Sequence, residues 1–248
     1  MNSLSVIIIT KNESTDIRAC LDSVRWADEI VVVDGGSRDD TVTICREYTD
    51  RVYICADWSG FGPQKNRALS YATGEWVLSV DADERVSPAL RKEIEHAMVS
   101  ERCVGYEIPR RSSYCGRALR HGGWWPDYVT RLFRRGTARF SDDLVHERLL
   151  VNGATGTLSQ PLLHTTYRDL EEVLAKINEY SSAAALIMHG QKKTAGLATA
   201  ILHGLWSFMR TYFLRCGFLD GKEGFMLAVS NAENSYYRYV KLMLMAKK

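Results

Sequence analysis

Asp81 and Asp83 follow an apolar run, and this placement constrains the chain more than any other feature of its sequence. The run at 76–80 (WVLSV) predicts a buried strand. Carboxylates just past such a strand face the crevice where open α/β sheets bind ligands. Divalent cations bind carboxylate oxygens and share their coordination with substrate phosphates, so the pair predicts a metal–diphosphate site. A lone Asp-x-Asp is more often a solvated acidic turn, so its neighbours must decide.

The first hundred residues alternate strand and helix patterns. Short connections between them predict an open, mostly parallel sheet with helices on both faces, an α/β fold. We expect strands at 4–10, 29–34, 51–56 and 76–80, and helices capped by Ser14 and by Asp39 or Asp40, followed by helices at 64–72 and 88–98.

Polar residues end three of these strands. Thr10, Asn12 and Glu13 follow the first strand, and Asp34 ends the second. Strand ends of a doubly wound sheet share one edge, so these groups and Asp81 should converge on a nucleotide. The sequence has neither Gly-x-Gly-x-x-Gly after its first strand nor a Gly-x-x-x-x-Gly-Lys-Ser/Thr loop, which argues against a dinucleotide fold and a phosphate-binding loop.

Four strings then carry a resemblance. SVIIITKNE at 5–13, VDGGSRDDT at 33–41, QKNRAL at 64–69 and ATGEWVLSVDADE at 72–84 resemble family 2 glycosyltransferases with the GT-A fold. The resemblance implies a nucleotide-sugar donor, a divalent cation (Mg²⁺ or Mn²⁺) and inversion at the anomeric carbon. It assigns donor nucleotide binding to Thr10, Asn12, Glu13, Asp34, Lys65 and Asp81, and metal binding to Asp83 with Asp81. Gly35 stands where many members carry a side chain that contacts the base.

An inverting transfer needs one general base to deprotonate the acceptor hydroxyl. Asp127, Asp142, Asp143 and Glu147 are candidates, and the string VHE at 145–147 resembles a base-bearing segment of the family, which favours Glu147. The alternative is a surface carboxylate paired with Arg148. His146 is a metal ligand, a contact to the diphosphate or a structural histidine.

The middle of the chain also carries candidate acceptor-binding side chains. Tryptophan rings can stack on a sugar, and guanidinium groups match phosphate geometry. Tryptophan pairs are more often core, and arginine runs more often a solvated face. The candidates are Arg110, Arg111, Trp124, Trp125, Asp127 and Arg131.

After residue 166 the pattern becomes helical, with aromatic and basic residues beside apolar stripes, which is typical of interfacial helices. Packing on the catalytic part would bury the same faces, and we expect both: part of these helices packs and the remainder faces lipid headgroups. We therefore expect a catalytic domain at 1–165 and C-terminal helices at 166–248 that touch an anionic membrane surface. No signal peptide or spanning segment is expected, which predicts a cytoplasmic protein peripheral on the inner face of a bacterial inner membrane. The net charge of only +2 gives no indication of nucleic-acid binding.

Over nearly its whole length the chain resembles bacterial lipopolysaccharide core β-1,4-glucosyltransferases. That implies UDP-glucose as donor and a lipid-linked saccharide, an inner-core heptose, as acceptor. Two other classes stay open: a sugar-nucleotide nucleotidyltransferase, whose Gly-rich signature the first strand end lacks, and a non-catalytic sugar-binding protein on a transferase fold.

Overall fold

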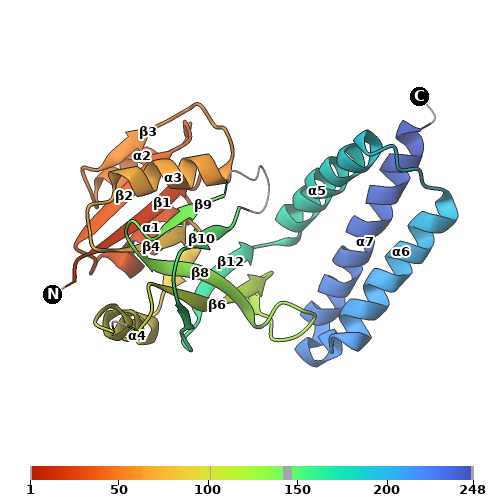
Figure 1. Ribbon diagram of the computed structural model, residues 1–248. Helices are drawn as coiled ribbons and strands as arrows, with labels where there is room; N and C mark the ends of the chain where they lie inside the picture. The colour runs from red at the N-terminus through yellow and green to blue at the C-terminus, as the bar shows by residue number, and fades with distance from the viewer. Residues whose placement is uncertain (1, 101, 142–146, 247–248) are drawn as a thin grey trace. The chain divides into compact units, whose positions relative to one another are not determined.

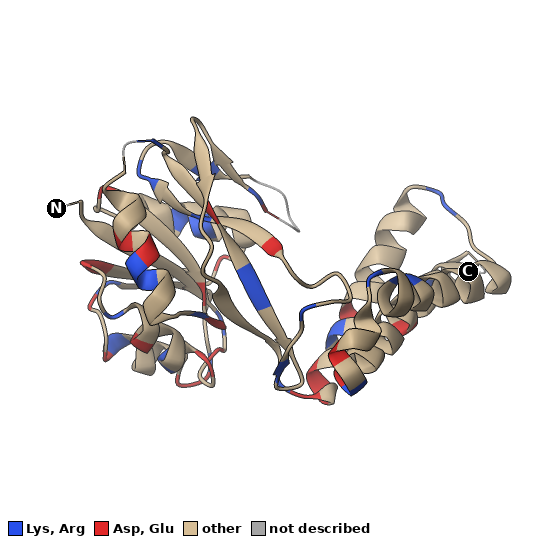
Figure 2. Ribbon diagram, turned by 90° about the horizontal axis from the view of Figure 1, so that it is seen from below, with Lys and Arg blue, Asp and Glu red and all other residues tan. Residues whose placement is uncertain are grey.

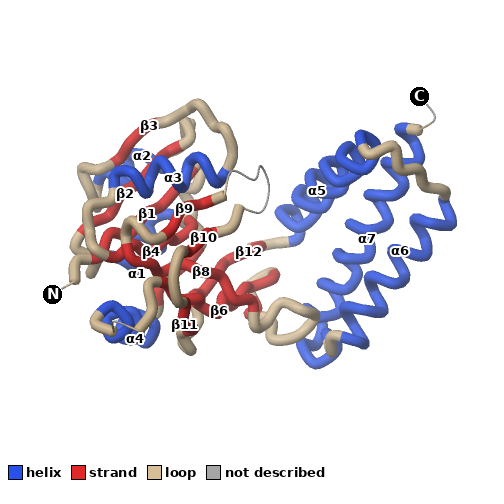
Figure 3. The backbone as a smooth tube through the Cα atoms, viewed as in Figure 1, coloured by secondary structure: helices blue, strands red, loops and turns tan. Residues whose placement is uncertain are grey.

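The computed structural model describes residues 2–100, 102–141 and 147–246. The chain forms two compact units (Figure 1). Unit 1 comprises residues 1–110 and 127–164, and unit 2 comprises residues 111–126 and 165–248. Strands gather in unit 1, and long helices make up most of unit 2 (Figure 3).

Unit 1 is built on four parallel strands, in the order β3-β2-β1-β4. Registers align their carboxyl ends: Thr10 lies opposite Asp34, and Ile9 lies opposite Asp81. Successive connections run to opposite sides of β1, so a topological switch point lies between β1 and β4. The strands are β1 (Leu4–Thr10), β2 (Glu29–Asp34), β3 (Val52–Ile54) and β4 (Trp76–Asp81).

Helices cover both faces of this sheet, because the side chains of β1 alternate between them. Val6 and Ile8 pack into the core with α1 and α4, whereas Ile7 and Ile9 pack with Ala68 of α3. The helices are α1 (Ile17–Val24), α2 (Thr41–Arg46), α3 (Phe61–Tyr71) and α4 (Pro88–Met98).

Beyond β4 the sheet becomes antiparallel. β8 pairs antiparallel with β4 and with β6, and β12 pairs antiparallel with β5. This part comprises β5 (Glu84–Val86), β6 (Gly105–Tyr114), β7 (Arg117–Ala118), β8 (Asp127–Arg134), β11 (Thr155–Thr157) and β12 (Leu162–Tyr167), with a separate hairpin of β9 (Ala138–Phe140) and β10 (Leu149–Val151). The expected GT-A-like α/β fold, mostly parallel at its core and with helices on both faces, is confirmed.

Unit 2 packs its helices around a small aromatic core. Tyr114 and Leu119, from the 111–126 segment, are buried with Val173, Ile177 and Leu227 of the long helices. This packing groups residues 111–126 with the C-terminal helices, although the sequence expectation placed them in the catalytic domain. The helices are α5 (Leu170–Gly190), α6 (Leu197–Met209), the π-helical η1 (Arg210–Leu214), the 3₁₀ turn η2 (Gly217–Asp220) and α7 (Gly221–Met245).

Four local predictions differ from the structure. Ser14 does not cap the first helix, because α1 begins only after Asp16 and has no side-chain cap. The third strand is shorter than 51–56, and the helix expected at 64–72 already begins at Phe61. Asp40 occupies the position before α2 without a side-chain bond, whereas the carboxylate of Asp39 accepts from the backbone N–H of Thr41 at 3.1 Å.

Candidate active site

Asp34 closes the turn that follows β2. Its Oδ1 accepts backbone N–H groups of Gly36 at 2.9 Å and Ser37 at 2.8 Å, and its carboxylate is almost fully buried. The N–H of Asn12 donates to Ser37 Oγ at 2.8 Å. The loops after β1 and β2 are therefore joined by a hydrogen bond, and the polar residues that follow these two strands lie together.

A second set of bonds fixes Glu13. Its backbone N–H donates to Thr41 Oγ1 at 2.8 Å, and Asp39 accepts from Thr41 and from the N–H of Ser14. Burial alone would raise the pKa of Asp39, but the hydrogen bonds from Thr41 and Ser14 lower it to about 2. The charged carboxylate of Asp39 thus accepts the hydrogen bonds that connect the loop after β1 to the start of α2.

Trp58 occupies the space beside Gly35. A Cβ on Gly35 would lie 2.6 Å from the Trp58 ring, so only glycine permits this approach. Lys11 lies 5.8 Å from the centre of the same ring. Gly35 stands where the family resemblance implies a side chain that contacts the base, and in this chain the indole of Trp58 lies beside that position.

Asp81 lies between two cations at the end of β4. Lys65 Nζ is 2.9 Å from Asp81 Oδ1, and Arg131 pairs with Oδ2. Burial alone would raise the pKa of Asp81, but Arg131 and Lys65 hold it well below its usual range. Asp81 is therefore charged at any physiological pH.

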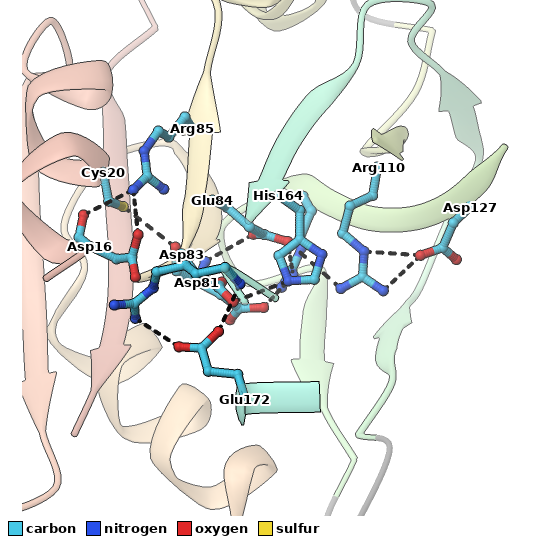
Figure 4. A network of polar contacts seen from close by, with 12 residues as sticks. Asp16, Cys20, Asp81, Asp83, Glu84, Arg85, Arg110, Asp127, His164 and Glu172 are labelled. Carbon is cyan, nitrogen blue, oxygen red and sulfur yellow. Dashed lines mark hydrogen bonds and ion pairs between the residues drawn. The ribbon is translucent and has the colours of Figure 1, made fainter. Parts of the chain in front are cut away.

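The ion pairs continue from Arg131 to Glu84, Arg110 and Asp127, and the last three are labelled in Figure 4. Arg131 Nη2 lies 2.6 Å from Glu84, whose carboxylate is fully buried and whose pKa is raised by that burial. Arg110 Nη1 lies 3.8 Å from Glu84, and Arg110 Nη2 lies 2.7 Å from Asp127. Arg131 and Arg110, predicted to hold acceptor phosphates, are thus paired with carboxylates inside unit 1.

Asp83 faces a histidine of β12, the strand that pairs with β5 immediately after Asp83. His164 Nε2, on β12, lies 3.1 Å from Asp83 Oδ2, and Figure 4 shows the two side chains meeting. The Asp83 side chain is 33% exposed and that of His164 is 13% exposed, so both are reachable from solvent. A carboxylate oxygen and an imidazole nitrogen suit a divalent cation that completes its shell with phosphate oxygens and water.

Within the residues that the structure describes, no set of three or more His, Cys, Asp or Glu side chains gathers to hold a metal. A cation here would thus depend on the donor for its remaining ligands. Mg²⁺ commonly binds in this way, through one or two carboxylates plus substrate phosphates.

Glu147 joins the other end of the ion-pair series. Lys65 Nζ donates to its Oε1 at 2.8 Å, and the Glu147 side chain is 16% exposed. Helix α3 also approaches closely: a Cβ on Gly62 would lie 1.9 Å from the carbonyl oxygen of Ser141. Asn66 of α3 exchanges two hydrogen bonds with the backbone of Phe140, and the N–H of Ser141 donates to the carbonyl oxygen of Arg148, so α3 is tied to the residue next to Glu147.

The remaining predicted residues fall elsewhere. Asp142, Asp143 and His146 lie outside the described residues. Arg111, Trp124 and Trp125 belong to unit 2. There Trp124 packs edge-on against Tyr114, with ring centres 5.9 Å apart, in the aromatic core.

Sequence reasoning missed two members of the site. Glu84 was part of the string at 72–84 but was given no role, and only its burial shows that it holds Arg131. His164 carried no signal, because a single histidine in a strand has no motif around it.

Comparison with known proteins decides the family. The sequence model of "Glycosyl transferase family 2" matches residues 5–150, which include Glu147 and every site residue of unit 1 except His164. The chain is a family 2 glycosyltransferase. This confirms the resemblance in the sequence and makes the protein a transferase.

Relatives of this glycosyltransferase extend over nearly its whole length. An uncharacterized glycosyltransferase of Rickettsia prowazekii is 33% identical, covering 98% of this chain and 87% of that protein. The lipopolysaccharide core biosynthesis glycosyltransferase LpsC of Rhizobium meliloti is 31% identical, covering 95% of this chain and 93% of that protein. Among solved structures, S. aureus TarS 1-349 in complex with UDP-GlcNAc superposes with a TM-score of 0.52 at 17% identity, covering 99% of this chain and 91% of that chain.

Proposed function

We propose that this glycosyltransferase moves a hexose, with inversion, from a UDP-sugar to a lipid-linked saccharide. The observation that carries the proposal is the cluster of Asp81, Asp83, His164 and Glu147 around the carboxyl end of β4, next to the switch point. It combines a cation-binding pair with a separate carboxylate that can accept a proton.

Asp83 and His164 would hold Mg²⁺ or Mn²⁺, which would neutralise the departing diphosphate. Asp81 serves differently, because both of its oxygens are paired with Lys65 and Arg131. It positions the two cations at the donor edge of the sheet. Metal binding by His146 remains a proposal that concerns a residue outside the described ones.

Glu147 is proposed as the general base. It accepts the proton of the acceptor hydroxyl while that oxygen bonds to the anomeric carbon and the bond from this carbon to the diphosphate breaks. Attack from the face opposite the leaving group inverts the configuration. Among the described residues, Asp127 is the alternative to Glu147 as the base, and its carboxylate pairs with Arg110.

The nucleoside is proposed to lie along Thr10, Asn12, Glu13 and Asp34. Thr10 supports this, because its hydroxyl is buried and has no hydrogen-bond partner among the described residues. Such a group is costly unless a ligand satisfies it. UDP is the nucleotide we propose, since the TarS structure of similar fold contains UDP-GlcNAc; glucose as the sugar rests on the sequence resemblance alone.

The proposed acceptor is an inner-core heptose of lipopolysaccharide. The LpsC relative supports lipopolysaccharide core synthesis as the process. Arg110, Arg111, Trp124, Trp125, Asp127 and Arg131 were predicted to bind the acceptor. Arg131 is buried in the ion-pair series of unit 1, so we propose that it holds Asp81 and Glu84 in place rather than contacts the sugar. Trp124 lies partly buried against the aromatic core of unit 2.

Unit 2 is proposed to rest on an anionic membrane surface, as a peripheral protein on the cytoplasmic side. Residues 191–219 contain four Lys or Arg and no Asp or Glu, and the helices are largely uncharged in Figure 2. Large apolar side chains are exposed there, among them Leu202 and Leu214 at 66% and Trp206 at 58%. In the part of the chain that the structure describes, no helix is long and apolar enough to cross a bilayer. Basic and aromatic groups beside such a face suit interfacial binding.

Sugar transfer to a delipidated core saccharide tests the proposal. UDP-glucose, UDP-galactose and UDP-GlcNAc are each incubated with enzyme, Mn²⁺ and acceptor, and UDP release and the saccharide product are measured. We expect one donor to give acceptor-dependent UDP release and an extended saccharide. Pyrophosphate release from UTP and a sugar 1-phosphate, without saccharide extension, would instead establish a nucleotidyltransferase.

A further inference from the structure

Lys65 connects the donor edge to the proposed base. Its Nζ is 2.8 Å from Glu147 and 2.9 Å from Asp81, and its side chain is only 5% exposed. One ammonium group thus serves two carboxylates that come from separate segments, one at the end of β4 and one before β10. Any ligand that draws the Lys65 ammonium away would therefore weaken its ion pairs with both Asp81 and Glu147.

Lys65 is also the cation of this cluster that can move. Arg131 is fixed, because it bonds Asp81 and the fully buried Glu84 together. The lysine ammonium is a point charge on a flexible stem, whereas the guanidinium is a rigid fork. An anion that arrives beside Asp81 would therefore compete first for Lys65.

We propose that Lys65 is a positioning residue that holds Glu147 while the donor site is empty and turns to the donor diphosphate when it binds. Donor binding then breaks the Lys65–Glu147 pair and frees the Glu147 carboxylate to accept the acceptor proton. Glu147 is thereby held by Lys65 until a donor is present. This inference rests on the proposed function.

UDP affinity, measured by calorimetry at constant Mn²⁺, tests this handover without any turnover. In the wild-type protein UDP must compete with Glu147 for Lys65. Glu147→Gln weakens that competitor and should tighten UDP binding about fivefold, since a largely buried charged pair is lost. In a Lys65→Met background the same change should have no effect, and this difference is the coupling that a double-mutant cycle measures.

Glu75→Gln controls for net charge, because Glu75 directly precedes β4 and its carboxylate pairs with Arg134. It should leave UDP affinity unchanged. If Lys65→Met does not fold, the single Glu147→Gln measurement still decides the inference. Unchanged or weaker UDP binding by Glu147→Gln would overturn the handover. No binding of UDP by the wild-type protein would overturn the proposed donor itself, a separately recognisable result.

Discussion

His164 Nε2 and Asp83 Oδ2 lie 3.1 Å apart although 81 positions separate them in the chain. β12 brings the histidine across β5, where His164 pairs with Glu84. The turn after β4 presents Asp83 to it. This contact is the cation-binding pair that we propose.

Replacing either partner should remove metal-dependent donor binding. Asp83→Ala and His164→Ala each take away one proposed ligand, so the UDP affinity gained on adding Mn²⁺ should fall at least tenfold and transfer should be lost. Calorimetry with and without Mn²⁺ measures this. Glu95→Ala, an exposed acid of α4, is the control and should bind as the wild type does. A normal Mn²⁺ response in His164→Ala would remove the histidine from the site.

Local patterns predicted much of unit 1. β1 and β2 have the predicted bounds, because uninterrupted apolar runs have few other ways to be buried. The shared edge of Thr10, Asp34 and Asp81 followed from parallel pairing alone. The bounds of a strand depend on residues that are neighbours in the sequence, and the shared edge depends on the rule that parallel strands end on the same side of the sheet.

The contacts that could not be predicted from the sequence join residues far apart in the chain. His164 meets Asp83 and Lys65 meets Glu147 only because the antiparallel part of the sheet and α3 fold back on the strand ends. Packing also decided which unit Tyr114 and Trp124 join, since their rings fill the core of unit 2. No local spacing encodes these partners.

Gly62→Ala should disturb the base through packing. The added methyl group would meet the Ser141 carbonyl at 1.9 Å, so α3 or the Glu147 segment must shift. Overpacking of this kind costs about 1–3 kcal/mol. Denaturant unfolding should show that loss, with turnover reduced further than stability explains. Gly136→Ala faces open space but has a positive φ, so it should lose stability through backbone strain while turnover per folded molecule is kept. Normal turnover in Gly62→Ala would show that this close approach is not needed.

Stability should depend on Asp39 in acid. The pKa of its carboxyl is about 2 in the folded protein and near 3.8 ordinarily, so the folded state favours the charged form. The stabilisation is therefore present above pH 4 and is lost as the pH falls toward 2. Asp39→Asn should lower Tm at pH 7, and the difference from the wild type should shrink as pH decreases. A difference that stays constant from pH 7 to pH 3 would contradict the charged role.

The membrane proposal predicts salt-sensitive vesicle binding. Arg210→Glu, Arg215→Glu and Lys222→Glu together reverse three exposed charges of unit 2. Each basic group contributes about 1 kcal/mol near an anionic surface. The triple variant should lose flotation with anionic liposomes and slow on a lipid acceptor, while transfer to a delipidated acceptor continues.

A matched triple reversal in unit 1 provides the control. Arg46, Lys92 and Arg102 are exposed there, and their replacement by Glu should leave flotation unchanged. Equal loss of flotation in both triples would attribute binding to net charge alone. Absence of wild-type flotation at low salt would refute the membrane proposal.

Glu147→Gln in a single-turnover transfer assay tests the central claim most directly. The enzyme is loaded with Mn²⁺ and the active UDP-sugar, mixed with delipidated acceptor, and the rate of saccharide formation is measured. Glutamine keeps the shape but cannot accept the proton, so the rate should fall about a hundredfold or more while the donor stays bound. Asp127→Asn, run in parallel, should retain most of the rate. A wild-type rate in Glu147→Gln, with the loss appearing in Asp127→Asn instead, would contradict the account.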